Sequence, residues 1–354
     1  MAALLLWGVH AGARRQTDAS FASRVAELSE PAGYFDTDNL ISNERSYLHV
    51  MPALQEGGVR GGAYVGVGPD QNFSYIAQVR PSIAFIVDIR RDNLLLHLLF
   101  KALFELAPTR VEYLALLHAR PPPPHPEELK DATIDRLVAY IDGAKTDAVA
   151  TDAARRRVDG ALKRFGVPLS KQDLETIDRF HRTFIDAGLS LKFQSTGRAP
   201  RTYYPTYRDL LLETDRQGRR RSFLVSEADY EFVRSLQERD LVIPVVGNLA
   251  GKSALASIGR LMEQRGDKLS AFYASNVEFY LFSDGGFPRF VENLARLPHT
   301  KNSLIIRSIF GGYTLPDSVP GYYSTSQVQP VDQVIEGNSH GRSQDYRELV
   351  GGRQ

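Results

Sequence analysis

The segment 63–88 constrains the fold of this chain more than any other, because it joins two apolar strand patterns through a glycine turn and a helix start. Gly66 and Gly68 stand in the turn, where the absent Cβ atoms let the backbone bend sharply and approach a ligand. Asp88 ends the second strand pattern, 88 − 68 = 20 residues after Gly68, where a parallel strand would present an acceptor for two ribose hydroxyls. The segment therefore predicts an α/β fold that holds a nucleotide-like cofactor.

The pattern by itself leaves the cofactor open. A dinucleotide fingerprint has a third glycine three residues after the second, and Gln71 occupies that position, which disfavours NAD. A glycine turn that binds no cofactor is a further alternative. The segment from Gly66 to Asp88 resembles more closely the first motif of class I S-adenosylmethionine (SAM) methyltransferases, although Asp70 stands where that motif has its third glycine.

The wider segment 66–93 is also similar to an uncharacterised bacterial family with a methyltransferase-like fold, and the similarity runs from about Leu40 to Phe310. Class I methyltransferases hold the methionine part of SAM with the glycine loop and the adenosine ribose with the acid after the second strand. The resemblance thus implies SAM as the cofactor and methyl transfer as the reaction. The bacterial family has no assigned reaction, so the acceptor and the catalytic residues stay open.

Strand and helix patterns alternate along the rest of the chain. Further apolar strand patterns lie at 241–246, 269–274 and 303–310, with helix patterns between them. This alternation predicts a doubly wound, mostly parallel (Rossmann-like) sheet with helices on both faces. We expect an N-terminal segment at 1–39 and an α/β domain at 40–312. Within this domain a helical insertion at about 108–189 is long enough to form a lid. An extended C-terminal arm at 313–354 should end in a short helix near 343–349.

The predicted site follows from this sheet, since ligands of doubly wound sheets bind at the carboxyl ends of the strands. The helix that begins near Gln71 would also direct free backbone N–H groups at an anionic group such as a carboxylate. The predicted cofactor-binding residues are Gly66, Gly68, Pro69, Asp70, Gln71, Asn72, Asp88, Arg90 and Asn248. The predicted substrate or rim residues are Asn43, Glu44, Tyr47, Ser275, Asn276 and Glu278.

Structural roles remain as alternatives for several of these residues. Asp88 would instead cap a helix or pair with Arg91, and Asn248 and Asn276 would stabilise ordinary strand-to-helix turns. The segment 40–52, which precedes the first strand, would be a packed arm. The eight histidines show no metal-ligand spacing, so we expect core or surface roles for them, His97 included, and no metal site.

Composition disfavours some partners and leaves the compartment open. The chain carries 43 basic and 42 acidic residues, a formal net charge of +1, so no global field favours nucleic acid. The sequence contains no run of about 20 apolar residues, so it does not predict a membrane-spanning helix. The apolar run 2–9 and the small residues Ala11-Gly-Ala13 match the end of a signal peptide without its basic start, so we expect a cytoplasmic location unless this run is a signal-peptide remnant.

The function that these observations favour is SAM binding, with methyl transfer to a small-molecule or protein acceptor. Such a reaction depends mainly on holding the two reactants in line, so it leaves no catalytic motif to find. Two alternatives stay open. One is a non-catalytic binding module on the same fold, and the other is a nicotinamide-dependent oxidoreductase, which would keep Asp88 but lacks the third glycine. The expected partner is a small-molecule ligand, and the oligomeric state stays open.

Overall fold

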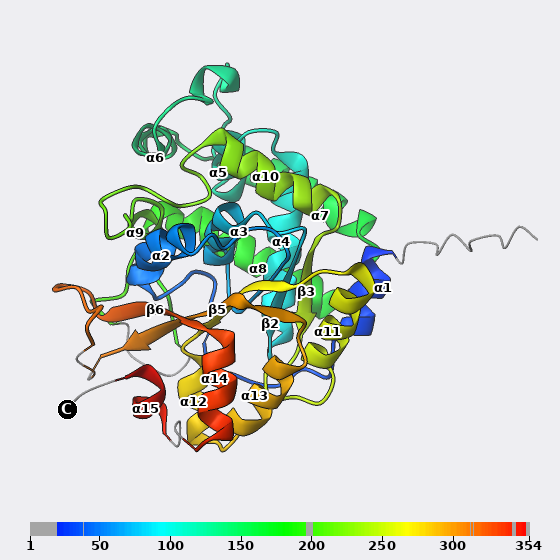
Figure 1. Ribbon diagram of the computed structural model, residues 1–354. Coiled ribbons are helices and arrows are strands. Elements are labelled where there is room, and N and C mark those ends of the chain that lie inside the picture. Colours follow the sequence, from blue (N-terminus) through cyan, green and yellow to red (C-terminus); the bar gives the residue numbers. More distant parts are fainter. Residues whose placement is uncertain are drawn as a thin grey trace, which may run out of the picture.

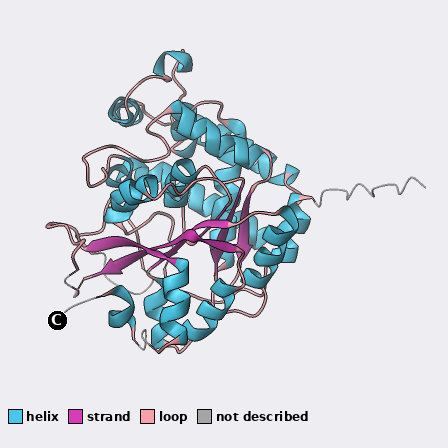
Figure 2. Cartoon of the chain, in the orientation of Figure 1, coloured by secondary structure: helices cyan, strands magenta, loops and turns pink. Residues whose placement is uncertain are grey.

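A computed structural model describes residues 20–37, 39–195, 201–311, 313, 315–341 and 345–351. Its centre is a six-stranded sheet with the strand order β3-β2-β1-β4-β5-β6 (Figures 1 and 2). The strands are β1 (Ala63–Gly66), β2 (Ile83–Asp88), β3 (Val242–Val246), β4 (Leu269–Ser275), β5 (His299–Phe310) and β6 (Ser324–Pro330). The signal-peptide pattern at 2–13 lies outside the described residues.

The first five strands are parallel to their neighbours, and β6 runs antiparallel to β5. The residues of β1, β2 and β3 are almost all buried, as expected of apolar runs that are covered on both faces. The predicted α/β fold with a mostly parallel sheet is therefore confirmed. The strand order reverses between β1 and β4, and at such a point the chain leaves a crevice beyond the carboxyl ends of the strands.

Helices cover both faces of the sheet (Figure 1). On one face α3 (Gln71–Val79), α4 (Arg91–Leu106) and α10 (Glu227–Glu238) pack together, and α7 (Ala148–Arg164) and α8 (Lys171–Ala187) lie against α4. Apolar residues on all sides of α4 explain its position between the sheet and these outer helices. The other face carries α1 (Phe21–Leu28), α11 (Ala254–Arg265), α12 (Val277–Ser283), α13 (Phe287–Ala295) and α14 (Val331–Ser339).

The predicted insertion is part of a longer run of helices, from α4 to α10, that separates β2 from β3. Its first helices are α5 (Arg110–Leu117) and α6 (Ile134–Gly143), with a short 3-10 turn, η2 (Pro126–Leu129), between them. The remaining short elements of the described chain are η1 (Arg45–Val50), α2 (Met51–Glu56), η3 (Gly188–Ser190), α9 (Tyr207–Leu211) and α15 (Tyr346–Val350).

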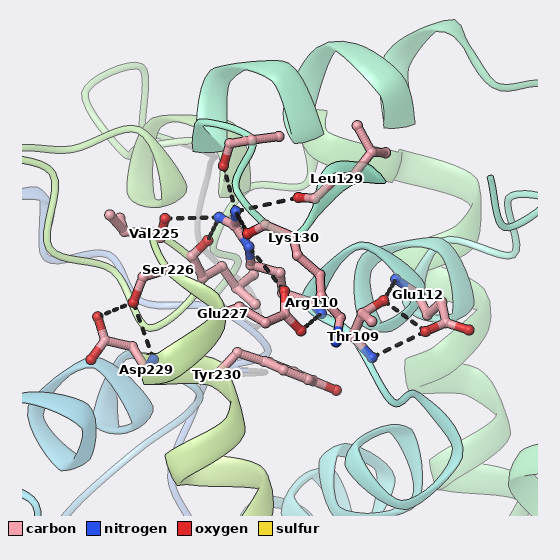
Figure 3. A network of polar contacts seen from close by, with 12 residues as sticks. Thr109, Arg110, Glu112, Leu129, Lys130, Val225, Ser226, Glu227, Asp229 and Tyr230 are labelled. Atoms are coloured by element: carbon pink, nitrogen blue, oxygen red, sulfur yellow. Dashed lines mark hydrogen bonds and ion pairs between the residues drawn. The ribbon is translucent and has the colours of Figure 1, made fainter. Parts of the chain in front are cut away.

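One buried arginine ties this helical region together. Arg110, only 1% exposed, forms an ion pair with Glu227 at 3.3 Å. Its guanidinium also donates to five backbone carbonyls, those of Leu129, Lys130, Ala132, Leu224 and Val225. Figure 3 shows this group between the start of α10 and the loop that follows η2. We call Arg110, Glu227 and these five carbonyls the Arg110 clamp.

The C-terminal region differs from the predicted extended arm. Residues 324–330 form β6, whose seven residues all pair with β5, and α14 and α15 follow it. Serine, threonine and glutamine fill most of β6, so no apolar alternation marks it in the sequence. A polar strand is stable there because it lies at the sheet edge and its serine hydroxyls find partners in η1 and β5. The short helix expected near 343–349 corresponds to α15, which begins at Tyr346. No helix in the described part of the chain has the length and apolar character needed to cross a bilayer.

Candidate functional site

A cavity of about 440 Å³ lies at the carboxyl ends of β1 to β4, where the strand order reverses. Its volume is within the range of small-molecule sites. We call it the strand-end cavity. Seven of the predicted site residues at strand ends and in the glycine turn line it: Gly68, Gln71, Asp88, Arg90, Asn248, Ser275 and Asn276. Two more predicted residues, Asn43 and Glu44, enter the wall from the segment that precedes η1.

The glycine turn is held from behind by Asn72. The side-chain amide of Asn72 donates to the carbonyls of Val67, Gly68 and Pro69 at 2.9, 3.3 and 2.7 Å. A Cβ atom at Gly66 would lie 2.0 Å from Oδ1 of Asn72, so this glycine makes room for the asparagine rather than for a ligand. Gly68 has a φ of +80°, which favours glycine. Of the predicted contacts in the turn, Gly66, Pro69 and Asn72 thus support the cavity wall without lining it.

His97 supports the same turn from α4. Its Nε2 lies 2.9 Å from the carbonyl oxygen of Gly68, and because a carbonyl only accepts, Nε2 carries the hydrogen. Burial lowers the pKa of His97 to about 4, so the ring is neutral at physiological pH. His97 is buried, as predicted for a core histidine. Its bond to the glycine turn gives it a role that no sequence pattern indicated.

Asp70 faces away from the strand-end cavity. Its Oδ2 accepts a hydrogen bond of 2.8 Å from the hydroxyl of Tyr207 in α9, and the residue is only 4% exposed. Burial raises the pKa of Asp70 to about 7. The predicted contact with a cofactor is therefore not made by this residue, which joins the start of α3 to α9 instead.

Asp88 and Arg90 form a single unit on the cavity wall. The Oδ1 atom of Asp88 accepts from the backbone N–H and Nε of Arg90 at 2.9 and 3.1 Å, and Oδ2 accepts from Nη2 at 2.9 Å. The ion-pair partner of Asp88 is thus Arg90 and not Arg91, which pairs with Asp173. Among the described residues Oδ2 of Asp88 accepts from Arg90 alone, and since a carboxylate oxygen accepts two bonds it retains one acceptor position.

Glu44 is a buried carboxylate in the same wall. It is 1% exposed and accepts hydrogen bonds from the hydroxyls of Tyr273, Ser275 and Ser308. Burial raises its pKa, and these three donors only partly offset that effect. Among the described residues Oε1 accepts from Ser275 alone, so it keeps one acceptor position.

Gln71 completes this cluster. Its Nε2 donates to the Tyr273 hydroxyl at 3.1 Å. Because the single hydrogen of that hydroxyl is given to Glu44, Gln71 must present its amide nitrogen there. Its Oε1 has no partner within the described chain, although Gln71 is only 7% exposed. Glu44, Tyr273 and Gln71, here called the Glu44 cluster, thus combine a poorly compensated negative charge with an unused acceptor.

A chain of serine hydroxyls connects the Glu44 cluster to the edge of the sheet. Ser308, which donates to Glu44, lies 3.3 Å from the hydroxyl of Ser326 in β6. Ser326 is 3.0 Å from Ser46 of η1, and Ser46 is 2.8 Å from Ser324. The late strand β6 therefore helps to orient a carboxylate that comes from the segment preceding the first strand.

The other predicted rim residues differ in their positions. Tyr47 donates to the carbonyl of Leu210 at 3.0 Å and does not line the strand-end cavity. Glu278 is away from the rim as well, because it forms a fully buried ion pair with Arg307 at 2.6 Å. Asn248 lines the cavity, but its Oδ1 accepts from the N–H of Ala250, as in an ordinary turn.

Sequence reasoning missed two groups of lining residues. Tyr34, Phe35 and Thr37 reach the cavity from the segment after α1, and adjacent aromatic residues were the only signal there. Phe193 and Ser195 come from the chain after η3. The predicted lid at 108–189 supplies none of the described lining residues. Within the described ranges no group of three or more His, Asp or Glu side chains is placed to hold a metal ion.

The fold and the cavity define an α/β protein with a small-molecule site at the switch point of a mostly parallel sheet. The chain belongs to the family described as "Domain of unknown function (DUF7790)", whose model matches residues 39–177 and 178–350. No curated protein matches the chain.

Proposed function

We propose that this protein binds SAM in the strand-end cavity and that it transfers the methyl group to a small-molecule or protein acceptor. The observation that carries the proposal is the Glu44 cluster, which has unused acceptors and, among the described residues, a buried carboxyl group without a cationic partner, in a cavity at the switch point. An α-ammonium group carries three N–H donors and a positive charge, so it would satisfy Oε1 of Glu44 and Oε1 of Gln71 together.

The other end of the cavity suits a nucleoside. Asp88 keeps one acceptor position on Oδ2 for a ribose hydroxyl, and Arg90 holds the carboxylate in place from its own backbone and side chain. The first turn of α3 has no side-chain cap, since Asp70 bonds to Tyr207 instead, and the positive end of the helix dipole favours a carboxylate. An amino acid joined to a nucleoside carries all three of these groups.

The dinucleotide alternative is less favourable. Gln71 stands where the dinucleotide fingerprint has its third glycine, and its Nε2 would lie 3.3 Å from a Cβ atom at Gly68, so a side chain fills the space that this glycine leaves for close packing of the helix. NAD also carries no ammonium group for the Glu44 cluster. Bound SAM would supply a methyl group on a positively charged sulfur. The residues of the chain bind and orient both reactants, which is the main requirement of this reaction.

Binding measurements with three related ligands test the proposal. S-adenosylhomocysteine at about 100 times its dissociation constant should stabilise the protein by about 2.7 kcal/mol, and NAD should not. 5′-Methylthioadenosine, which lacks the ammonium and carboxylate, should bind at least about 30-fold more weakly than S-adenosylhomocysteine in calorimetry. Equal stabilisation by NAD, or no stabilisation by S-adenosylhomocysteine, would contradict the proposal.

A second measurement separates the enzyme from a non-catalytic module. Mass spectrometry of small-molecule and protein extracts incubated with the pure protein and SAM should detect a product that gains one methyl group. Binding of S-adenosylhomocysteine without any methylated product would favour the non-catalytic module.

A further inference from the structure

A second cavity of about 530 Å³ adjoins the strand-end cavity. The two share a wall of six described residues: Asn43, Phe193, Ser195, Tyr204, Asn276 and Tyr280. A molecule in the second cavity would therefore stand next to a molecule in the first. This is the arrangement that a two-substrate reaction requires.

Aromatic side chains dominate the second cavity. Of its fifteen described lining residues, nine are Phe or Tyr. Tyr203 and Tyr323, from segments far apart in the chain, stack with ring centroids 3.8 Å apart and planes inclined by 25°. They remain 39% and 45% exposed, so part of each ring is open to solvent although burial is the usual fate of such groups. Flat ring surfaces of this kind stack on other planar π systems.

The charges around this cavity select between aromatic ligands. Arg201 lines it and forms no ion pair with any described residue, and none of its described lining residues is a carboxylate. A cationic ligand would gain attraction from the ring faces but would meet the charge of Arg201 without a counter-ion. An anionic ligand would instead gain a charge-assisted hydrogen bond from the guanidinium. Burial raises the pKa of Tyr203 to about 12, so this phenol stays neutral.

We infer that the second cavity binds a planar aromatic molecule with a carboxylate substituent. In the proposed function this molecule is the second substrate. Only its role as a substrate rests on the proposed function, and its binding does not. The aromatic rings stack on the planar part of the ligand, and Arg201 binds its carboxylate at the outer side. The amides of Asn43 and Asn276 lie in the wall between the two ligands.

Calorimetry on the full chain with three probes tests the inference. The probes are 2-naphthoate, its saturated analogue decahydro-2-naphthoate, and phenyltrimethylammonium. We expect 2-naphthoate to bind at least about tenfold more tightly than either of the other two. Tyr323→Leu, which removes a ring at a half-exposed position, should weaken naphthoate binding about tenfold, whereas Tyr140→Leu on α6, outside both cavities, should not change it.

Arg201→Gln tests the charge selection. This variant should weaken 2-naphthoate about tenfold but leave 2-naphthol unchanged, and Arg260→Gln on the far helix α11 should affect neither. Tighter binding of the saturated or the cationic probe, or equal losses in the control variants, would overturn the inference. S-adenosylhomocysteine binding is measured in the same variants, none of which alters the strand-end cavity. If S-adenosylhomocysteine does not bind, the proposed function alone is contradicted. If 2-naphthoate does not bind, this inference alone is contradicted.

Discussion

The Arg110 clamp and the Glu44 cluster are both built around a buried charge, but they treat it in opposite ways. The guanidinium of Arg110 has an ion-pair partner and five carbonyl acceptors, so each of its N–H donors is used. Among the described residues Glu44 has three hydroxyl donors and no cation, and beside it Gln71 keeps an unpartnered oxygen. A satisfied network fixes the fold, whereas an unsatisfied one is available for a ligand.

The positions of the two networks explain this difference. The Arg110 clamp collects carbonyls from the segment around the end of η2 and from the loop before α10 (Figure 3), so the arginine joins these two segments. The Glu44 cluster lies beyond the strand ends, where the fold itself leaves space. The comparison predicts that substitutions in the first region change stability and those in the second change binding.

The largest effect is expected from Arg110→Met. Removal of the guanidinium leaves the Glu227 carboxylate and several carbonyls without their donor, which should lower the free energy of unfolding by about 3–5 kcal/mol in urea denaturation. Arg182→Met, which breaks an exposed pair with Asp178, should cost less than about 1 kcal/mol. Similar losses in the two variants would remove the basis of the comparison.

Asp70→Asn tests a buried carboxylate that has one donor. Its folded pKa of about 7 exceeds the usual 3.8, so its contribution to stability is complete below pH 3.8 and is lost as the pH rises through 7. Asparagine should therefore raise the free energy of unfolding at pH 8, by up to about 4 kcal/mol, with no gain below pH 4. Asp173, whose bond to Arg91 lowers its pKa to about 2, is the opposite control. Asp173→Asn should lose stability above pH 4, and a loss at pH 8 in both variants would refute the assignment for Asp70.

Glu44→Gln should change binding without a loss of stability. Loss of the charge should weaken S-adenosylhomocysteine about 30-fold, or about 2 kcal/mol, and leave adenosine unchanged. Burial raises the pKa of Glu44, and a bound ammonium group would stabilise its ionised form and lower that pKa. Affinity should therefore fall as the pH is lowered. Glu278→Gln, which breaks the pair with Arg307, should instead reduce stability. The comparison fails if Glu44→Gln unfolds the protein and binding is unaffected.

The smallest effect is expected from Asp88→Asn. The carboxylate offers one acceptor position beside its bonds to Arg90, so calorimetry should find adenosine and S-adenosylhomocysteine weakened by the same factor, about fivefold or about 1 kcal/mol. An equal loss for both ligands would place the ribose at Asp88. A loss confined to S-adenosylhomocysteine would assign Asp88 to the amino-acid end instead.

The sequence predicts the parallel part of the sheet because fully covered strands are continuous apolar runs, and those patterns coincide with β1 to β5. It fails for β6, whose serines are stable only because hydroxyl partners arrive from η1 and β5. The pattern of residues along a short segment contains no information about partners that lie so far away in the sequence.

The position of the candidate site can also be predicted from the sequence, but the directions of its side chains cannot. The offset from Gly68 to Asp88 locates the cavity wall, since it depends only on a strand, a helix and a second strand. It does not show which way a side chain turns: Asp70 accepts from Tyr207 of α9, and Asn72 donates back to the glycine turn. Tyr34 and Tyr204 line the cavity through loops whose course no periodicity fixes.

The bond between Ser46 and Ser324 joins residues 278 positions apart in the chain. During synthesis η1 leaves the ribosome before any strand and β6 leaves it last of the six strands, so the serines of β6 that support Glu44 are available only near the end of translation. Contacts of such long range also form slowly. A newly made chain can therefore have its helical region closed around Arg110 while the cavity is still immature, and the ability to bind a ligand should be the last property that the folding protein acquires.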